Sequence, residues 1–156
     1  MAIRKIRLVP DDILRKKSRP VEAVDGGVQE LIQDMLETMY QVNGVGLAAV
    51  QVGVLKRVIV MDISENCDQP IVMINPELVH KEGTQMFREA CLSIPGLSGM
   101  VERPALVVVK GLDPNGKPQE LSCEGDLAVV MCHELDHLDG ILYTDIATEL
   151  FQPDHG

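Results

Sequence analysis

Residues 133–140 read HELDHLDG, and this stretch decides how the rest of the chain is interpreted. His133 and His137 stand four residues apart, with Glu134 directly after the first histidine. On an α-helix, residues i and i+4 lie one turn apart on the same face, so both imidazoles reach one metal ion and the glutamate projects toward a water on that ion. The pattern predicts a metal-binding helix, although a polar helix can carry these letters by chance.

Apolar residues around the motif favour a functional site over a chance pattern. Five of them interleave with the polar positions: Ala128, Val129, Met131, Leu135 and Leu138. Their spacing predicts a mostly buried helix over residues 127–138, with Asp126 as its N-cap and Gly140 beyond its end. Because burying histidines and acids is costly unless they are paired, we expect those of the motif to bind something.

A hydrolytic metal site needs a third protein ligand, because tetrahedral catalytic sites use three side chains and one water. Downstream of His137, the candidates are Glu149 and His155. Upstream, Cys91 lies in EACLSIPG (89–96), where a strand would hold its thiolate against the helix. A lone cysteine in an apolar setting is more often a packing residue than a ligand, so spacing alone leaves the third ligand open.

The composition is that of one globular domain. The chain has 156 residues, 46% of them hydrophobic, and a formal net charge of −10. That length suffices for one buried core, and the negative charge opposes binding to nucleic acid or to anionic membranes. The N-terminus lacks a signal-peptide core, and no apolar run approaches the ~20 residues of a membrane span. We expect a single domain over residues 1–156, a cytoplasmic location, and neither nucleic acid nor membrane as a partner.

The remaining periodicity predicts one more helix and several strands. Apolar residues recur at helical spacing between residues 28 and 40, after Asp25 and two glycines. Short β-branched runs, separated by turn residues, lie at 57–63, 71–76 and 105–113. Because no helical segments separate these runs, antiparallel pairing is favoured. The predicted fold class is α+β, with mixed, mainly antiparallel sheets packed around the central metal-binding helix.

Three separated blocks of sequence resemble the signature motifs of one family. GVGLAAVQ (44–51), EACLS (89–93) and HELDH (133–137), in this order, are similar to the three motifs of the peptide deformylases. The similarity extends to DDILRKKSRPV near the N-terminus and to HLDGILYTD after the third motif. It therefore covers nearly the whole chain and implies the peptide deformylase fold.

The resemblance implies a ligand set, a metal and an activity. In that family the ligands are the two histidines of the third motif and the cysteine of the second, which are His133, His137 and Cys91 here. The implied physiological ion is Fe²⁺, with Zn²⁺, Ni²⁺ or Co²⁺ able to occupy the site, and a His₂Cys donor set suits several of these metals. The implied activity is removal of the N-formyl group from nascent polypeptides that begin with formylmethionine.

Hydrolysis of a formamide requires an activated water, a stabilised oxyanion and a proton for the leaving nitrogen. Glu134 is the predicted base and acid. The resemblance assigns oxyanion stabilisation to the side-chain amide of Gln51 together with the backbone N–H of Leu92. Four residues near the motifs are candidates for the substrate pocket: Val45, Gly46, Phe87 and Val130.

Two departures from the family pattern bear on activity and on partners. Ala90 stands where the second motif usually has glycine, and its methyl group would narrow the substrate channel or restrict the backbone. The chain also ends soon after Ile146, without the extended C-terminal helix of many bacterial relatives, so we do not expect a ribosome-binding role of such a tail. The expected partner is the formylated nascent polypeptide, with transient proximity to the ribosome.

Two alternatives belong to other functional classes. The first is a relative that binds metal and holds a peptide terminus but has no catalytic activity. The residue that motivates this hypothesis is Ala90. The second is a zinc protease of internal peptide bonds that uses Glu149 as the third ligand.

Overall fold

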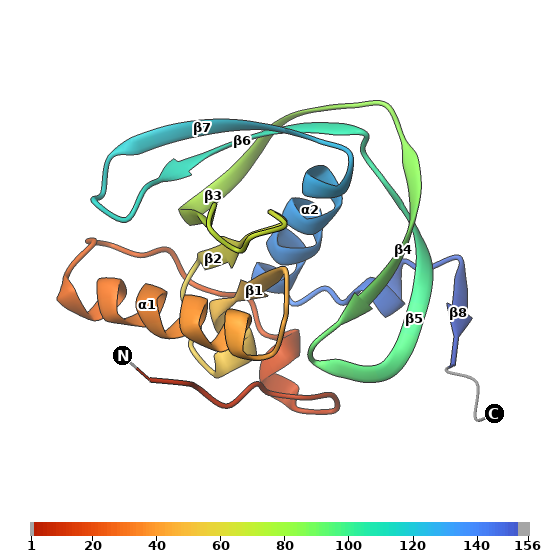
Figure 1. The fold of residues 1–156 in the computed structure, drawn as a ribbon, viewed down its shortest axis with the longest axis horizontal. Coiled ribbons are helices and arrows are strands. Elements are labelled where there is room, and N and C mark those ends of the chain that lie inside the picture. Colours follow the sequence, from red (N-terminus) through yellow and green to blue (C-terminus); the bar gives the residue numbers. More distant parts are fainter. Residues whose placement is uncertain (1, 153–156) are drawn as a thin grey trace.

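Residues 2–152 are described by the computed structural model, and they form two antiparallel sheets and two α-helices (Figure 1). The larger sheet has the order β1-β2-β3-β6-β7, with β1 (Gly46–Ala48), β2 (Val58–Met61), β3 (Ile71–Glu82), β6 (Leu106–Leu112) and β7 (Pro118–Glu124). The smaller sheet has the order β4-β5-β8, with β4 (Gln85–Cys91), β5 (Ile94–Arg103) and β8 (Glu149–Phe151). The helices are α1 (Gly26–Gln41) and α2 (Asp126–Leu138), with 3₁₀ turns η1 (Asp12–Arg15), η2 (Ala49–Val52) and η3 (Tyr143–Asp145). All pairs of these strands are antiparallel, and the predicted α+β class is confirmed.

Helix α1 packs against β1 and β2 of the larger sheet. The Asp25 carboxylate caps it by accepting from the Val28 N–H at 3.0 Å, which satisfies one of the unpaired donors at the helix start. The helix buries a stripe with the predicted spacing: Val28, Leu31, Ile32, Met35 and Met39. The stripe predicted between residues 28 and 40 is therefore confirmed, and its methionines fill the core.

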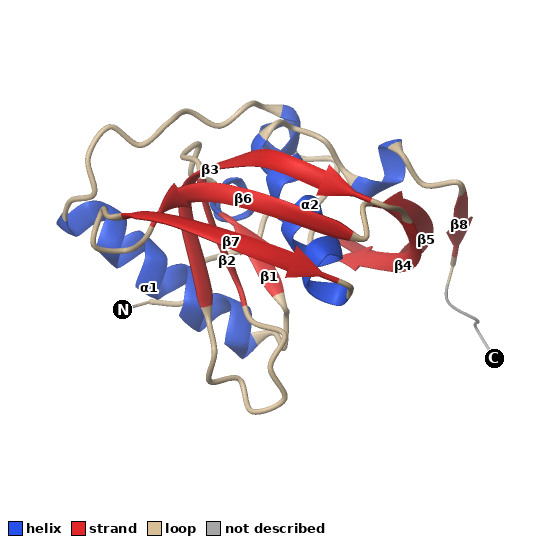
Figure 2. Ribbon diagram, turned by 90° about the horizontal axis from the view of Figure 1, so that it is seen from above, coloured by secondary structure: helices blue, strands red, loops and turns tan. Residues whose placement is uncertain are grey.

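Helix α2 lies between the larger sheet and the β4–β5 hairpin (Figure 2). Its predicted N-cap was wrong, because Gly125 is the capping residue and Asp126 lies in the first turn. Gly125 has a φ of +58°, a conformation that side chains disfavour, and it turns the chain from β7 into the helix. Asp126 still interacts favourably with the positive end of the helix dipole.

The β4–β5 hairpin brings the second motif to the metal-binding helix. Side chains alternate along β4, so the inward positions end with the buried Glu89 and Cys91, while Arg88 and Ala90 are exposed. The expectation that a strand holds Cys91 against the helix is confirmed.

Two further features of the chain bear on its class. All four cysteines lie in the described residues and are free thiols. Between residues 2 and 152, neither α-helix combines the length and the apolar character that crossing a membrane requires.

Candidate metal centre

Three side chains from two distant segments converge on one point. The Cys91 Sγ lies 3.3 Å from the His137 Nε2, which lies 3.2 Å from the His133 Nε2. One donor atom from each of the three residues falls within 4.8 Å of the others. Cys91 ends β4, and the two histidines lie on successive turns of α2. The structure thus brings together the two histidines and the cysteine that the sequence analysis named.

The spacing of these donors fits a tetrahedral metal ion. Metal–nitrogen bonds of ~2.0 Å and metal–sulfur bonds of ~2.3 Å at tetrahedral angles place neighbouring donors about 3.3 to 3.6 Å apart. The separations of 3.2 and 3.3 Å agree with this requirement. Glu149 is exposed on β8 and outside this donor group, and His155 lies outside the described residues.

The pKa values of the two imidazoles are shifted in opposite directions. Burial and the neighbouring charge of His133 lower the pKa of His137, which favours the neutral form that binds metal. Burial opposes the charge on His133 as well, but hydrogen bonds to Cys91 and Glu89 outweigh it and raise the pKa of His133 to about 10. An ion at this site would therefore displace a proton from His133.

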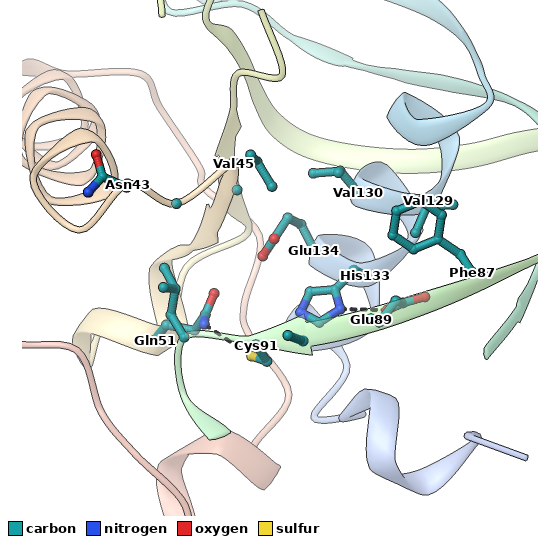
Figure 3. Close-up of a pocket in the computed structure, with 14 residues that line it drawn as sticks. Asn43, Val45, Gln51, Phe87, Glu89, Cys91, Val129, Val130, His133 and Glu134 are labelled. Atoms are coloured by element: carbon teal, nitrogen blue, oxygen red, sulfur yellow. Dashed lines mark hydrogen bonds and ion pairs between the residues drawn. The ribbon is translucent and has the colours of Figure 1, made fainter. Parts of the chain in front are cut away.

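A buried ion-pair network orients His133. Its Nδ1 lies 2.8 Å from the Glu89 Oε1 (Figure 3). This contact leaves the Nε2 directed toward His137, whose Nε2 lies 3.2 Å away. Arg103, at the end of β5, donates to both oxygens of Glu89 at 2.6 and 2.8 Å and to Asp136 of α2 at 2.7 Å. Burial would raise the pKa of Glu89, but hydrogen bonds from Arg103 and His133 keep it below its ordinary value.

The network includes functional residues that sequence reasoning missed. Glu89 stands two residues before Cys91 in the second motif, so it occupies the same face of the strand. The alternation of side chains along a strand could therefore have predicted that Glu89 faces the metal-binding helix. Arg103 gave no local signal, because its partners come from a different strand and from the helix.

Glu134 occupies a buried position beside the donor group. Its side chain is 4% exposed, and its Oε1 has no hydrogen-bond partner among the described residues. Burial raises its pKa to about 7, although the neighbouring His133 acts in the opposite direction. A carboxyl group with this pKa exchanges protons near neutral pH.

Gly46 is required by this carboxylate. A Cβ atom at residue 46 would collide with the Glu134 Oε2 and would lie 3.0 Å from the Val130 Cγ1. The glycine of the first motif therefore makes room for the glutamate of the third motif.

Gln51 reaches the donor group from η2. Its Oε1 accepts from the Ala48 N–H at 2.9 Å, and its Nε2 donates to the Ser93 Oγ at 3.1 Å and toward the Cys91 Sγ at 3.7 Å. Leu92 follows Cys91 in the turn between β4 and β5. Both Gln51 and Leu92 line the cavity that opens onto the centre.

A cavity of about 360 Å³ opens beside the donor group (Figure 3). The four residues proposed for the substrate pocket all line it: Val45, Gly46, Phe87 and Val130. Val45 is 50% exposed, as expected for a residue at the rim. Asn43 and Val129 also line the cavity and were not predicted.

A buried helix that offers two histidines and a glutamate, opposite a cysteine sulfur and beside an apolar cavity, is typical of a metallohydrolase. Comparison with known proteins identifies the family to which the chain belongs within this class. The family model for polypeptide deformylases matches residues 3–152. A peptide deformylase of Alkaliphilus metalliredigens is 54% identical over 145 residues, which cover 93% of this chain and 97% of the relative.

Solved structures agree with the sequence relatives. The crystal structure of a peptide deformylase from Legionella pneumophila has a TM-score of 0.91 and 48% identity, and the match covers 94% of this chain and 86% of that chain. A peptide deformylase from Synechococcus elongatus, solved in complex with actinonin, has a TM-score of 0.88 and 40% identity over 92% of this chain and 78% of that chain. The chain belongs to the peptide deformylase family, whose members are metal-dependent enzymes.

Proposed function

We propose that this protein removes the N-formyl group from nascent polypeptides that begin with formylmethionine and releases formate. Family membership supports the reaction class. The observation that carries the proposal for this chain is the convergence of Cys91 with the two histidines of α2 beside an apolar cavity.

The donors that would hold the ion are Cys91, His133 and His137. We propose Fe²⁺ as the physiological ion, with Zn²⁺, Ni²⁺ or Co²⁺ able to replace it, because two imidazoles and a thiolate suit all four metals. When bound, a divalent ion lowers the pKa of a water molecule and polarises the formyl carbonyl.

Glu134 is proposed as the general base and acid. Its buried carboxylate lies next to the donor group, and its pKa of about 7 suits it to take the proton of the attacking water and to pass that proton to the departing amine. The Glu134 Oε1 supports this role, because a buried oxygen that has no hydrogen bond among residues 2–152 is available to substrate and water.

Gln51 and Leu92 are proposed to stabilise the oxyanion. The Gln51 Nε2 donates toward the donor group, where negative charge develops on the formyl oxygen. The backbone N–H of Leu92 would supply a second donor from the turn that follows Cys91. Two neutral donors stabilise the developing charge without adding a proton that titrates near neutral pH.

The methionine side chain is proposed to occupy the apolar cavity, whose candidate lining residues are Val45, Gly46, Phe87 and Val130. We further propose that residues 1–156 act as one catalytic domain in the cytoplasm. Its partners would be the nascent chain and, transiently, the ribosome that carries this chain. Nucleic acid and membrane are not proposed as partners.

Formate release from a formyl-Met peptide tests the proposal. Protein purified anaerobically and loaded with Fe²⁺ or Ni²⁺ should release formate at a rate that scales with metal content. No formate at full metal occupancy would instead support the catalytically silent relative motivated by Ala90. An Ala90→Gly variant is the matched comparison, because it restores the usual residue of the motif without touching a ligand.

Replacement of Cys91 by serine distinguishes the proposal from the zinc protease. Cys91→Ser should lower metal content and formate release together, because it removes one of three donors. The protease alternative, with Glu149 as the third ligand, predicts retained metal in this variant. Glu149→Gln is the control and should leave metal content unchanged.

A further inference from the structure

The Gln51 amide is held in one orientation by two neighbours. The Ala48 backbone N–H can only donate, so its 2.9 Å contact identifies the acceptor oxygen of the amide. The amide nitrogen carries two hydrogens, and the Ser93 Oγ accepts one of them at 3.1 Å. The second hydrogen points toward the Cys91 Sγ. One N–H of Gln51 therefore faces the metal centre.

Ser93 belongs to a different part of the fold from Gln51. Gln51 lies in η2, next to the larger sheet, whereas Ser93 lies in the turn between β4 and β5 of the smaller sheet. Ser93 is fully buried and Gln51 is 1% exposed. The contact between these side chains therefore requires that two separate loops be held at a fixed distance.

The N-terminal strap, residues 2–9, connects these two loops through its main chain. The Arg7 N–H donates to the Gln51 carbonyl at 2.6 Å, and the Val9 N–H donates to the Ser93 carbonyl at 2.9 Å. Residues two apart in an extended segment direct their N–H groups to the same side, so one short stretch bonds both loops. In Figure 1 the strap runs below α1 and ends at η1, beside the turn of the β4–β5 hairpin.

The strap is itself anchored at both ends. At its start, the Ala2 N–H and the Arg4 guanidinium donate to the buried Asp34 of α1 at 2.7 and 2.9 Å. Beyond its end, the Asp11 side chain caps η1 by accepting from the Ile13 N–H at 3.0 Å. Between these anchors Lys5 and Leu8 are exposed, and the middle of the strap is held by packing of Ile6 on the core and by the main-chain bond of Arg7.

We infer that Ser93 is a positioning residue for Gln51, and that the N-terminal strap holds the two loops so that one Nε2 hydrogen of Gln51 points at the metal centre. This inference rests on the proposed function, in which Gln51 stabilises the oxyanion. A hydrogen-bond donor that already points at the developing charge stabilises the transition state far more than one that must reorient during the reaction.

A double-mutant cycle tests the role of Ser93. Ser93→Ala removes one of the two contacts that orient the amide, so kcat should fall roughly tenfold while KM and metal content stay unchanged. In a Gln51→Ala background the same Ser93→Ala change should have no further effect, because no amide remains to be positioned. An equal loss in both backgrounds would overturn the inference, since it would show a general structural role.

Proline substitutions test the strap. Arg7→Pro removes the N–H that donates to Gln51, and kcat should fall while metal content is retained. Arg7→Ala keeps that N–H and loses only the side chain, and Lys5→Pro places a proline elsewhere on the strap, so both should retain normal kcat. Equal loss in Lys5→Pro and Arg7→Pro would overturn the role of this bond.

Failure of the inference is distinguishable from failure of the proposed function. If Gln51→Ala alone leaves kcat unchanged in an enzyme that releases formate, the oxyanion assignment is wrong and the inference falls with it. If Gln51→Ala is slow and Ser93→Ala adds independently, the inference alone is overturned. A melting temperature within a few degrees of the parent shows that each variant is folded.

Discussion

At the scale of single residues, the centre depends on what surrounds Glu134. Its carboxylate occupies the space that a Cβ atom of residue 46 would need, and its pKa is near neutrality because it is buried. The first and third motifs are thus coupled sterically, which explains why a glycine-bearing segment accompanies the metal helix. The sequence predicted Gly46 as part of the substrate pocket, and the structure adds that the space beside Gly46 is occupied by the Glu134 carboxylate.

Replacing Glu134 with alanine should separate binding of the ion from turnover. Since Glu134 is not one of the three donors, Glu134→Ala should keep its metal. Turnover should fall on the order of 10²- to 10⁴-fold, the usual contribution of a general acid and base. Metal content by elemental analysis and formate release are measured on the same sample, and near-normal kcat at full occupancy would refute the assigned base.

Substitution of Val130 tests the proposed substrate pocket. It lines the cavity from α2, yet it is not a ligand. Val130→Phe should fill part of the cavity and raise KM for formyl-Met peptides by roughly tenfold or more, since lost burial of one apolar side chain is worth ~1.5–3 kcal/mol. Metal content should not change. Unchanged kinetics would remove Val130 from the pocket.

At the scale of elements, the strongest connection is the buried network that joins β4, β5 and α2. Arg103 links Glu89 of β4 to Asp136 of α2, and its side chain is 5% exposed. A buried arginine with two carboxylate partners fixes the angle between the hairpin and the helix. The same contacts set the ring orientation of His133, so the network serves both the fold and the centre.

Arg103→Gln should weaken metal binding and stability together. Loss of the arginine leaves Glu89 buried without its main partner, which costs about 3–5 kcal/mol for a pair of this kind. The altered support of His133 should lower metal affinity roughly 10- to 100-fold, as measured by chelator competition. Arg15→Gln is the control, because Arg15 is exposed, pairs with Asp145 and has no bond to the metal-binding helix. Equal metal affinity in both variants would contradict the positioning role.

The sequence predicted some elements better than others for a physical reason. The β-branched runs at 57–63, 71–76 and 105–113 contain β2, the first part of β3, and β6. In contrast, β5 and β7 were missed, because β5 contains two glycines, β7 is mostly polar, and both gain stability from pairing with neighbours. Local pattern cannot reveal partners that are distant in sequence.

The same limit applies to the candidate centre. The histidine pair was predicted from helical spacing, and Cys91 from the resemblance of its motif to one family. Arg103 and Ser93 act through residues from other elements, so neither was predicted. The strap at residues 2–9 gave no sequence signal, because its bonds to the site come from backbone N–H groups that every residue other than proline carries.

At the scale of the whole molecule, buried carboxylates make stability depend on pH. Asp62 accepts hydrogen bonds from the Ser64 hydroxyl, from the Tyr40 hydroxyl at 2.6 Å, and from the Ser64 and Gln69 N–H groups at 2.8 and 3.1 Å. Burial would raise the pKa of Asp62, but these bonds outweigh it and lower the pKa below 3.8. The stabilisation is therefore present above the unfolded pKa and is lost as the pH falls through the lower folded value.

Because the pKa of Asp62 is lowered in the folded state, the protein should lose stability in acid. The free energy of unfolding from urea titrations should decline between about pH 5 and pH 2, and Asp62→Asn should show a smaller decline than the parent. Asp68→Asn, an exposed position of the same loop, is the control and should follow the parent. An unchanged slope in Asp62→Asn would contradict the assignment.

The central claim is that one sulfur and two imidazole nitrogens, from segments far apart in the chain, bind a single ion. X-ray absorption at the zinc edge of the zinc-loaded protein tests it most directly. Binding by Cys91, His133 and His137 predicts one sulfur at about 2.3 Å and two nitrogens at about 2.0–2.1 Å, with the sulfur shell absent in Cys91→Ser. A spectrum of the parent that contains only nitrogen and oxygen neighbours would rule out Cys91 as a ligand.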